Sequence, residues 1–95
     1  ILIDMVKSTS REALIFLPND RAMVRIDRLG IIDYLVKASQ NGATVKIICP
    51  MSEANANVVK RISERAPLIQ VLNGNNSPYG MYIVDNENWI NIRYS

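Results

Sequence analysis

Short apolar runs alternate along this chain with longer segments whose apolar residues recur every three or four positions. The short runs, several of them rich in β-branched side chains, predict strands. They occupy residues 13–17, 44–49, 68–72, 81–84 and 89–94. The periodic segments predict amphipathic helices, whose apolar stripes would face a core. These helices are expected at 1–7, at 21–40, and from a cap at Ser52 to a stop at Pro67.

Local signals refine the long helix predicted at 21–40. Asn19 and Asp20 offer an N-terminal cap, and the pair Asn41-Gly42 is typical of a left-handed C-terminal cap. Gly30 lies inside the run, where glycine costs about 1 kcal/mol relative to alanine. We therefore expect a break, or a close approach of another segment, near Gly30.

The order of the elements predicts an α/β fold. We expect a mainly parallel or mixed sheet with helices on both faces, and the run at 13–17 as a strand buried on both sides. The strands 81–84 and 89–94 would form a C-terminal β-hairpin with a four-residue loop at 85–88. We interpret residues 1–95 as a single domain cut from a longer protein, because the chain lacks an initiator methionine and ends inside an apparent strand.

Composition excludes several classes of function. The chain has 95 residues, 48% of them hydrophobic, which is enough for a core of its own. It contains no histidine, which removes Ser-His-Asp triads and histidine metal sites, so we expect no metal and no cofactor. The net charge of +2 is too mild for a dedicated nucleic-acid binder. The single cysteine, Cys49, predicts a small buried hydrophobe and favours a cytoplasmic protein, and no apolar run is long enough for membrane insertion.

The candidate binding site lies at the carboxyl edge of the predicted sheet, where ligands bind in open α/β folds. Segments 18–21, 50–52 and 73–77 would meet there and suit a small polar or anionic ligand, or a partner surface. The candidate site residues are Asn19, Arg21, Arg25, Ser52, Asn75, Asn76, Ser77 and Tyr79. The alternative is that these loops are ordinary connections and that Arg21, Arg25 and Arg28 form a solvated basic stripe.

Three stretches, EALIFLPN, LVKASQNGATVKIICP and SPYGMYIVDNENW, together resemble one half of a phospholipase D-like domain. That family carries an HxKxxxxD motif, with the histidine as nucleophile and the lysine stabilising phosphate charge. Aligned on Asp85, the histidine falls at Pro78 and the lysine at Gly80. Neither residue can do that chemistry, so the resemblance implies a scaffold without catalytic residues. Asp85 is then most simply a residue that orients the hairpin turn.

A narrower set of stretches is similar to sensor regions of archaeal signal-transduction histidine kinases. These stretches are DRLGIIDYL, ASQNGATVKIICPMSEAN, RISERAP and VLNGNNSPYGMYIVDNE. The resemblance implies a non-catalytic input domain of a two-component system, forming a homodimer, with the kinase region in the same polypeptide. Two alternatives stay open. One is a phosphodiesterase or nuclease half-domain completed by other residues, and the other is the ligand-binding module of an archaeal transcriptional regulator.

Overall fold

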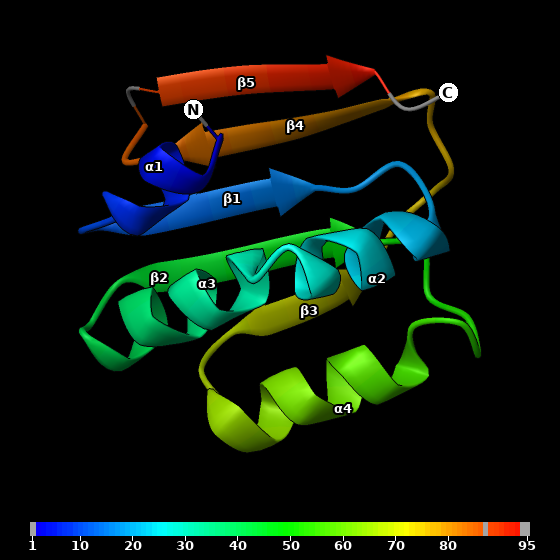
Figure 1. The fold of residues 1–95 in the computed structure, drawn as a ribbon, viewed down its shortest axis with the longest axis horizontal. Helices are drawn as coiled ribbons and strands as arrows, with labels where there is room; N and C mark the ends of the chain where they lie inside the picture. Colours follow the sequence, from blue (N-terminus) through cyan, green and yellow to red (C-terminus); the bar gives the residue numbers. More distant parts are fainter. Residues whose placement is uncertain (1, 87, 94–95) are drawn as a thin grey trace.

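A five-stranded mixed sheet and four helices make up the fold of residues 2–86 and 88–93, which the computed structural model describes (Figure 1). The strands follow the order β3-β2-β1-β4-β5 across the sheet. Their bounds are β1 Glu12–Phe16, β2 Thr44–Cys49, β3 Gln70–Asn73, β4 Tyr79–Val84 and β5 Asn88–Arg93. The helices are α1 Leu2–Lys7, α2 Asp20–Arg28, α3 Ile31–Gln40 and α4 Ala56–Arg65.

The sheet is parallel on one side of β1 and antiparallel on the other. β2 pairs with β1 and with β3 in parallel, and Ile15 lies opposite Ile47. β4 runs antiparallel to β1, with Ile15 opposite Tyr82, and it forms a hairpin with β5. The expected mixed α/β sheet with a C-terminal hairpin is confirmed. Val84 pairs with Asn88, so the hairpin loop has three residues and not the four that were predicted.

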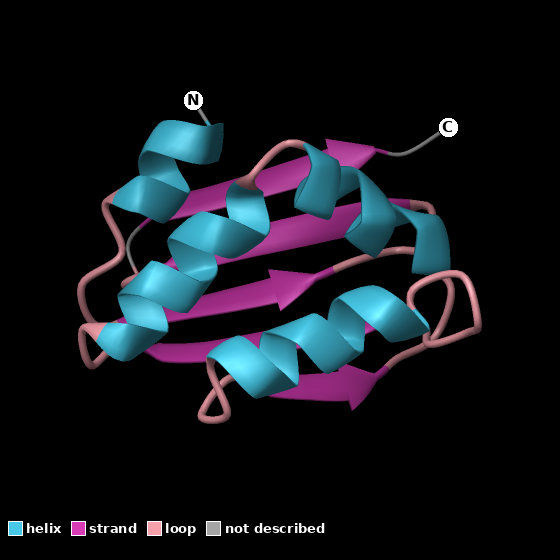
Figure 2. Cartoon of the chain, turned by 60° about the horizontal axis from the view of Figure 1, so that its bottom comes forward, coloured by secondary structure: helices cyan, strands magenta, loops and turns pink. Residues whose placement is uncertain are grey.

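All four helices cover one face of the sheet, which corrects the expectation of helices on both faces (Figures 1 and 2). The reason lies in the strand order. β2 is added beside β1, and β3 beside β2, in the same direction across the sheet. Right-handed crossovers in one direction leave their helices on the same face. A change of direction would place a helix on the other face, but the chain returns to β4 by the loop 74–78, without a helix.

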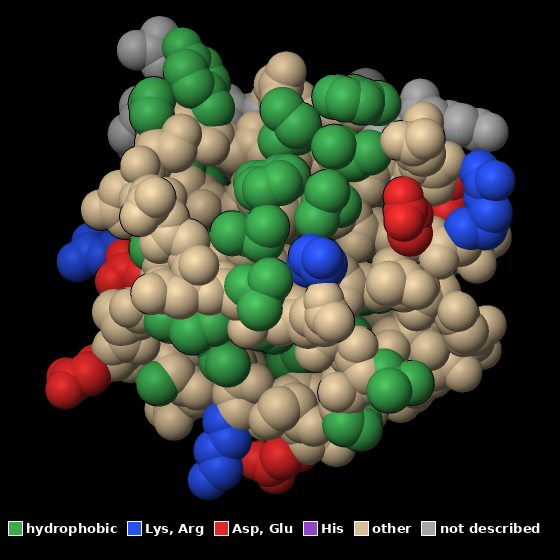
Figure 3. All heavy atoms as spheres, turned by 180° about the vertical axis from the view of Figure 1, so that it is seen from behind, with side chains coloured by type: hydrophobic (Ala, Val, Ile, Leu, Met, Phe, Trp, Pro, Cys, Tyr) green, Lys and Arg blue, Asp and Glu red, His purple; other side chains and the backbone are tan. Residues whose placement is uncertain are grey.

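The core lies between the helices and the face of the sheet that they cover. Ile15, Ile47 and Tyr82 are fully buried there. Their neighbours on the strands, such as Leu14 and Phe16, point to the other side and are only partly buried. The prediction that β1 is buried on both faces is therefore wrong. Seen from behind, the uncovered face carries a broad group of hydrophobic side chains (Figure 3).

Backbone conformation explains where the helices begin and end. Gly30 has φ +80°, a left-handed conformation, and it separates α2 from α3, as the sequence predicts. Asn19 caps α2 by accepting a hydrogen bond from the backbone N–H of Ala22 at 2.9 Å. Gly42, at φ +101°, ends α3, and the N–H of Ala43 donates to the carbonyl of Ala38. These three predictions are confirmed.

The start of α4 differs from the prediction. The helix begins at Ala56, after a turn, and Asn55 occupies the cap position in place of Ser52. The hydroxyl of Ser52 accepts from the N–H of Ala54 at 3.0 Å and donates to Asp20 at 2.5 Å. Ser52 therefore closes the turn before α4 and does not cap the helix. No helix in the described ranges, 2–86 and 88–93, is long and apolar enough to span a bilayer.

Candidate functional site

Three segments meet at the carboxyl edge of the parallel strands, as the sequence predicts. The loop 74–78 crosses the ends of β2 and β1 on its way from β3 to β4. The N–H of Gly74 donates to the carbonyl of Cys49 at 3.1 Å, and the N–H of Ser77 donates to that of Pro18 at 2.9 Å. The side chain of Asn73 accepts from the N–H of Met51 at 3.0 Å. These bonds hold the crossover loop against both strand ends.

A buried amide, Asn55, joins the first two of these segments. Its side-chain nitrogen donates to the carbonyls of Asp20 and Pro50, at 3.2 and 3.0 Å, and to the sulfur of Cys49 at 3.6 Å. Its oxygen accepts from the N–H of Ser52 at 3.1 Å. Because Asn55 is fully buried and every polar atom of its side chain is paired, it fixes the edge internally. The sequence analysis missed this residue, since a single asparagine in a polar turn carries no distinctive signal.

The charged and nucleophilic groups at this edge serve structural roles. The hydroxyl of Ser52 lowers the pKa of Asp20 by hydrogen bonding to its carboxylate. Burial raises the pKa of Cys49 to about 11, and the charge of Asp20 adds to this effect. Cys49 is therefore a thiol at neutral pH and a poor nucleophile. Its prediction as a small buried hydrophobe is confirmed, because the residue is fully buried within the core.

A hollow of about 420 Å³ lies on the uncovered face, beneath the crossover loop. Its size falls in the range of small-molecule sites, roughly 300–1,000 Å³. Its walls are mostly apolar, with polar side chains from the loop and from β5 at its margin. The lining residues are Phe16, Leu17, Ile48, Asn75, Ser77, Tyr79, Gly80, Met81 and Asn91.

The eight predicted site residues do not form one site. Asn75, Ser77 and Tyr79 line the hollow, and Asn76 is exposed in the same loop but outside the lining. The structure brings these four together, because one short segment carries all of them. The hydroxyl of Ser77 also accepts from the N–H of Tyr79 at 3.2 Å, which shapes the turn into β4.

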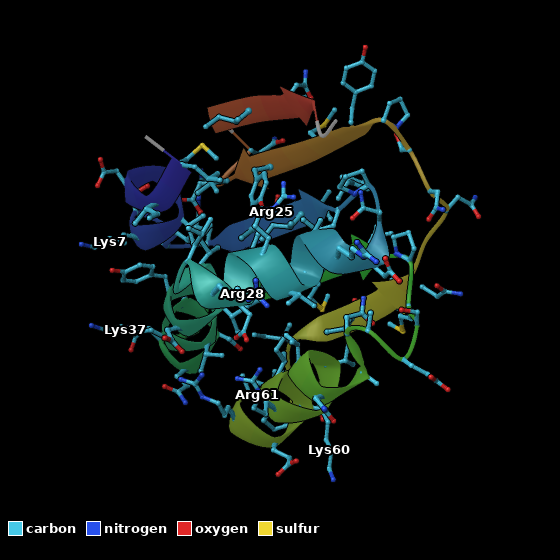
Figure 4. The ribbon with its side chains drawn as sticks, turned by 45° about the vertical axis from the view of Figure 1, so that its right-hand side comes forward. Lys7, Arg25, Arg28, Lys37, Lys60 and Arg61 are labelled. Carbon is cyan, nitrogen blue, oxygen red and sulfur yellow. The ribbon has the colours of Figure 1, made fainter. Side chains whose placement is uncertain are left out.

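The other four predicted residues lie elsewhere. Asn19 and Ser52 have their side chains engaged in the cap of α2 and the turn before α4. Arg21 and Arg25 are exposed on α2, in the helical layer, where Arg28 also lies (Figure 4). They belong to the opposite side of the sheet from the hollow, so the expected anionic site that combines arginines with the loop does not form.

Basic side chains spread over the helical layer and do not gather at one point (Figure 4). Arg61 of α4 forms an ion pair with Asp27 at 2.7 Å, and Arg65 pairs with Asp33 at the same distance. Asp27 and Asp33 are thus paired with arginines of α4. Within residues 2–86 and 88–93, no three acidic, histidine or cysteine side chains lie close enough to hold a metal ion.

The apolar wall of the hollow is what sequence reasoning missed. Phe16, Ile48 and Met81 belong to three of the predicted strands, and the sequence analysis expects the first of these, 13–17, to be buried on both faces. The strand order shows which face of the sheet stays uncovered. With β2 and β3 added in one direction, only one face receives helices, and alternate residues of each run must face away from them. The sequence therefore predicts the polar loop residues at the margin of the hollow and not the apolar side chains that line it.

The positions of the phospholipase D-like motif have structural roles. Gly80 is buried within β4, opposite Ile92 of β5, and Pro78 is exposed at the end of the crossover loop. Asp85 follows β4 with φ +54°, at the end of the sheet remote from the hollow. Its carboxylate accepts from the backbone N–H groups of Ser10, Arg11 and Glu12, at distances of 2.7 to 3.3 Å.

These hydrogen bonds change the acidity of Asp85. Burial alone would raise its pKa, but the N–H groups of Glu12, Arg11 and Ser10 together lower the pKa to about 2. The carboxylate is therefore ionised over the physiological range and saturated with donors from the protein. The guanidinium of Arg11 also donates to the carbonyl of Asp85 at 2.9 Å. The hypothesis that Asp85 orients the hairpin turn is confirmed.

Neither a protein-family model nor a curated protein matches this chain.

Proposed function

We propose that this chain is a non-catalytic sensory or regulatory input domain, whose ligand occupies the hollow beneath the crossover loop. The hollow is the observation that carries the proposal. It combines an apolar wall with a few convergent polar groups, which is the usual constitution of a small-molecule site. We further propose, from the sequence resemblance, that the domain serves a cytoplasmic signal-transduction histidine kinase.

The lining suggests the chemistry of the ligand. Phe16, Ile48 and Met81 would contact an apolar body, while the amides of Asn75 and Asn91 would hydrogen bond to polar groups at its edge. The described lining contains no lysine or arginine. An uncharged ligand with an aromatic or branched apolar part therefore fits this hollow better than the anion expected from the sequence.

The side chains at the aligned motif positions favour a regulatory role over a catalytic one. The chain has no histidine, and its motif positions hold Pro78 and Gly80. The carboxylate of Asp85 is occupied by three backbone N–H groups at the far end of the sheet from the hollow. The crossover loop, by contrast, is hydrogen bonded to the ends of both β1 and β2. A ligand that orders this loop would change contacts shared by several elements, as a sensor requires.

Two probes of one shape test the proposal. Benzamide and benzoate share an apolar ring and differ in charge, so we expect benzamide to shift the amide NMR signals of residues 75–81 and benzoate to bind no better. Replacing Asn75 by alanine should weaken benzamide binding by up to about tenfold, the loss of one hydrogen bond. Asn76→Ala is the matched control, because Asn76 is exposed in the same loop and outside the lining. Equal effects of the two variants, or shifts elsewhere in the chain, would remove the hollow as the site.

A further inference from the structure

The face of the sheet opposite the helices carries large apolar side chains on all five strands. They form a continuous group across this face (Figure 3), and a basic side chain stands among them. Strand alternation and pairing assign the members of this group, which we call the open face. Its large apolar residues are Leu14, Phe16, Ile48, Leu72, Tyr79, Met81, Ile83 and Trp89.

The register arranges the open face in two rows that cross the sheet. One row runs Trp89, Ile83, Leu14, Lys46, Gln70, and the next runs Asn91, Met81, Phe16, Ile48, Leu72. Apolar side chains fill the centre of the second row and, except for Lys46, that of the first, and amides occur only at the ends. An apolar centre with polar groups at the margin is the anatomy of a protein–protein interface.

Three of the large apolar side chains on the open face are about half exposed to solvent. Trp89 is 60% exposed, Tyr79 54% and Leu72 46%. Monomeric proteins rarely expose contiguous apolar patches larger than a few hundred Å². Aromatic residues and methionine are also enriched at interfaces. The open face therefore has the composition of a surface that another protein covers.

We propose that the occupant is a second copy of this chain, packed sheet against sheet through the open face. The size of the face sets the strength of such a dimer. Five strands of four to six residues, about 4.8 Å apart and rising about 3.3 Å per residue, give a flat area of roughly 400 Å². A standard stable interface buries about 800 Å² on each partner, so the open face fits a weak dimer that forms at high concentration. The symmetric arrangement would bury the same surface on both copies, as a two-fold dimer does.

Charge agrees with a second copy as well. The charged side chains described on the strands of the open face are Glu12 and Lys46, on the neighbouring strands β1 and β2. They are of opposite sign, so Glu12 of one copy can pair with Lys46 of the other. Lys46 lies within the apolar rows, and no ion pair to it is found among residues 2–86 and 88–93. A second copy brings a carboxylate, Glu12, to a face that contains the ammonium group of Lys46.

The open face and the proposed ligand site overlap, because Phe16, Ile48, Tyr79 and Met81 belong to both. A second copy would therefore cover the hollow, and dimer formation and ligand binding compete. Leu72, Ile83 and Trp89 lie outside the lining of the hollow, so they report on the dimer alone. Dimer formation is measured without benzamide, and benzamide binding is measured at a concentration where the chain is monomeric, which keeps the failure of one proposal distinct from the failure of the other.

The single tryptophan of the chain, Trp89, reports directly on this face. We expect sedimentation equilibrium of the wild-type chain, from about 1 µM to about 1 mM, to show a monomer that becomes a dimer. Over the same range the emission of Trp89 should shift to shorter wavelength and become less sensitive to acrylamide. A chain that remains monomeric at the highest concentration would overturn the proposal and leave the face to a different protein. A dimer with unchanged Trp89 emission would place the contact elsewhere and also overturn it.

A matched pair of variants locates the contact. Leu72→Arg places a charge on the open face, whereas Leu68→Arg places the same charge in the loop between α4 and β3, where Leu68 is 82% exposed. We expect Leu72→Arg to raise the dimer dissociation constant at least about tenfold, and Leu68→Arg to leave it unchanged. Equal effects would overturn the proposal. Circular dichroism checks that both variants fold, and if Leu72→Arg does not fold, the wild-type Trp89 measurement decides alone.

Discussion

The carboxylate of Asp85 accepts a hydrogen bond from the backbone N–H of Arg11 at 2.7 Å, which ties the β4–β5 turn to the segment leading into β1. The two residues are 74 positions apart. The backbone of Asp85 also donates, through its N–H, to the carbonyl of Glu12 at 2.8 Å. An aspartate that only a sequence resemblance aligns with a catalytic motif is thus the anchor of an antiparallel strand pair.

Replacing Asp85 by alanine should lower the free energy of unfolding by about 2 kcal/mol, because hydrogen bonds to a charged group contribute about 1.5–3 kcal/mol and the freed N–H groups lose their acceptor. Urea denaturation measures this. The control is Asp33→Ala, which removes an exposed ion pair with Arg65 and should cost no more than about 1 kcal/mol. Similar losses for the two variants would mean that Asp85 is no more than a surface acid.

Stability should also fall in acid because of Asp85. Its pKa in the folded chain, about 2, lies below the ordinary aspartate value of 3.8 that applies to an unfolded chain. A lowered folded pKa contributes stability above the unfolded value, and that contribution is lost as pH falls through the folded value. We expect the difference in unfolding free energy between wild type and Asp85→Asn to be constant above about pH 5 and to shrink from about pH 4 to about pH 2. A difference that stays constant down to pH 2 would contradict the assignment.

Asn55 should be among the polar residues most sensitive to substitution. Asn55→Leu removes a buried side chain with four hydrogen bonds and leaves the carbonyls of Asp20 and Pro50 without their donor. We expect a loss of about 2–4 kcal/mol in unfolding free energy. Asn57→Leu, on the exposed side of α4, is the control and should change stability by less than about 0.5 kcal/mol. Comparable losses would contradict the role given to the buried amide.

The class of the fold could be predicted from the sequence because its signals are local. Periodicity, the caps at Asn19 and Asn41, and the break at Gly30 depend on neighbours along the chain. The layer structure depends on strand order instead. β4 returns beside β1 and not beside β3, and no local signal in the loop 74–78 specifies that choice. The expectation of two covered faces failed for this reason.

The candidate site was predicted only in part for a related reason. Asn75, Ser77 and Tyr79 were found because polar residues in a strand-end loop are a recognisable pattern. Arg21 and Arg25 were expected beside them, but α2 lies on the other side of the sheet from the hollow. Apolar residues such as Ile48 look alike in sequence whether they line a core or an open face. Their role follows only from which face the helices cover.

The approach of Gly74 to β2 predicts a coupling with Ile48. A Cβ added at Gly74 would lie 2.7 Å from Cγ2 of Ile48, so Gly74→Ala must displace this side chain or the loop. We expect a cost of about 1–3 kcal/mol in unfolding free energy, typical of overpacking. In an Ile48→Ala background the same change should cost less, because Cγ2 is gone, and a double-mutant cycle measures the difference. If the losses of unfolding free energy simply add in the double variant, the two residues are not coupled.

Lys46 and Glu12 provide an electrostatic test of the proposed dimer that is independent of packing. Lys46→Glu would give the open face two like charges on each copy, so the dimer should weaken and then recover partly as salt screens the repulsion. Adding Glu12→Lys to this variant restores one charge of each sign at the two positions and should restore most of the affinity at low salt. The wild type, which has opposite charges at these two positions, should depend less on salt than Lys46→Glu alone. Sedimentation equilibrium of the four chains at low and high ionic strength measures these effects. If the double variant dissociates as readily as the single one, the charges of the two copies do not face each other.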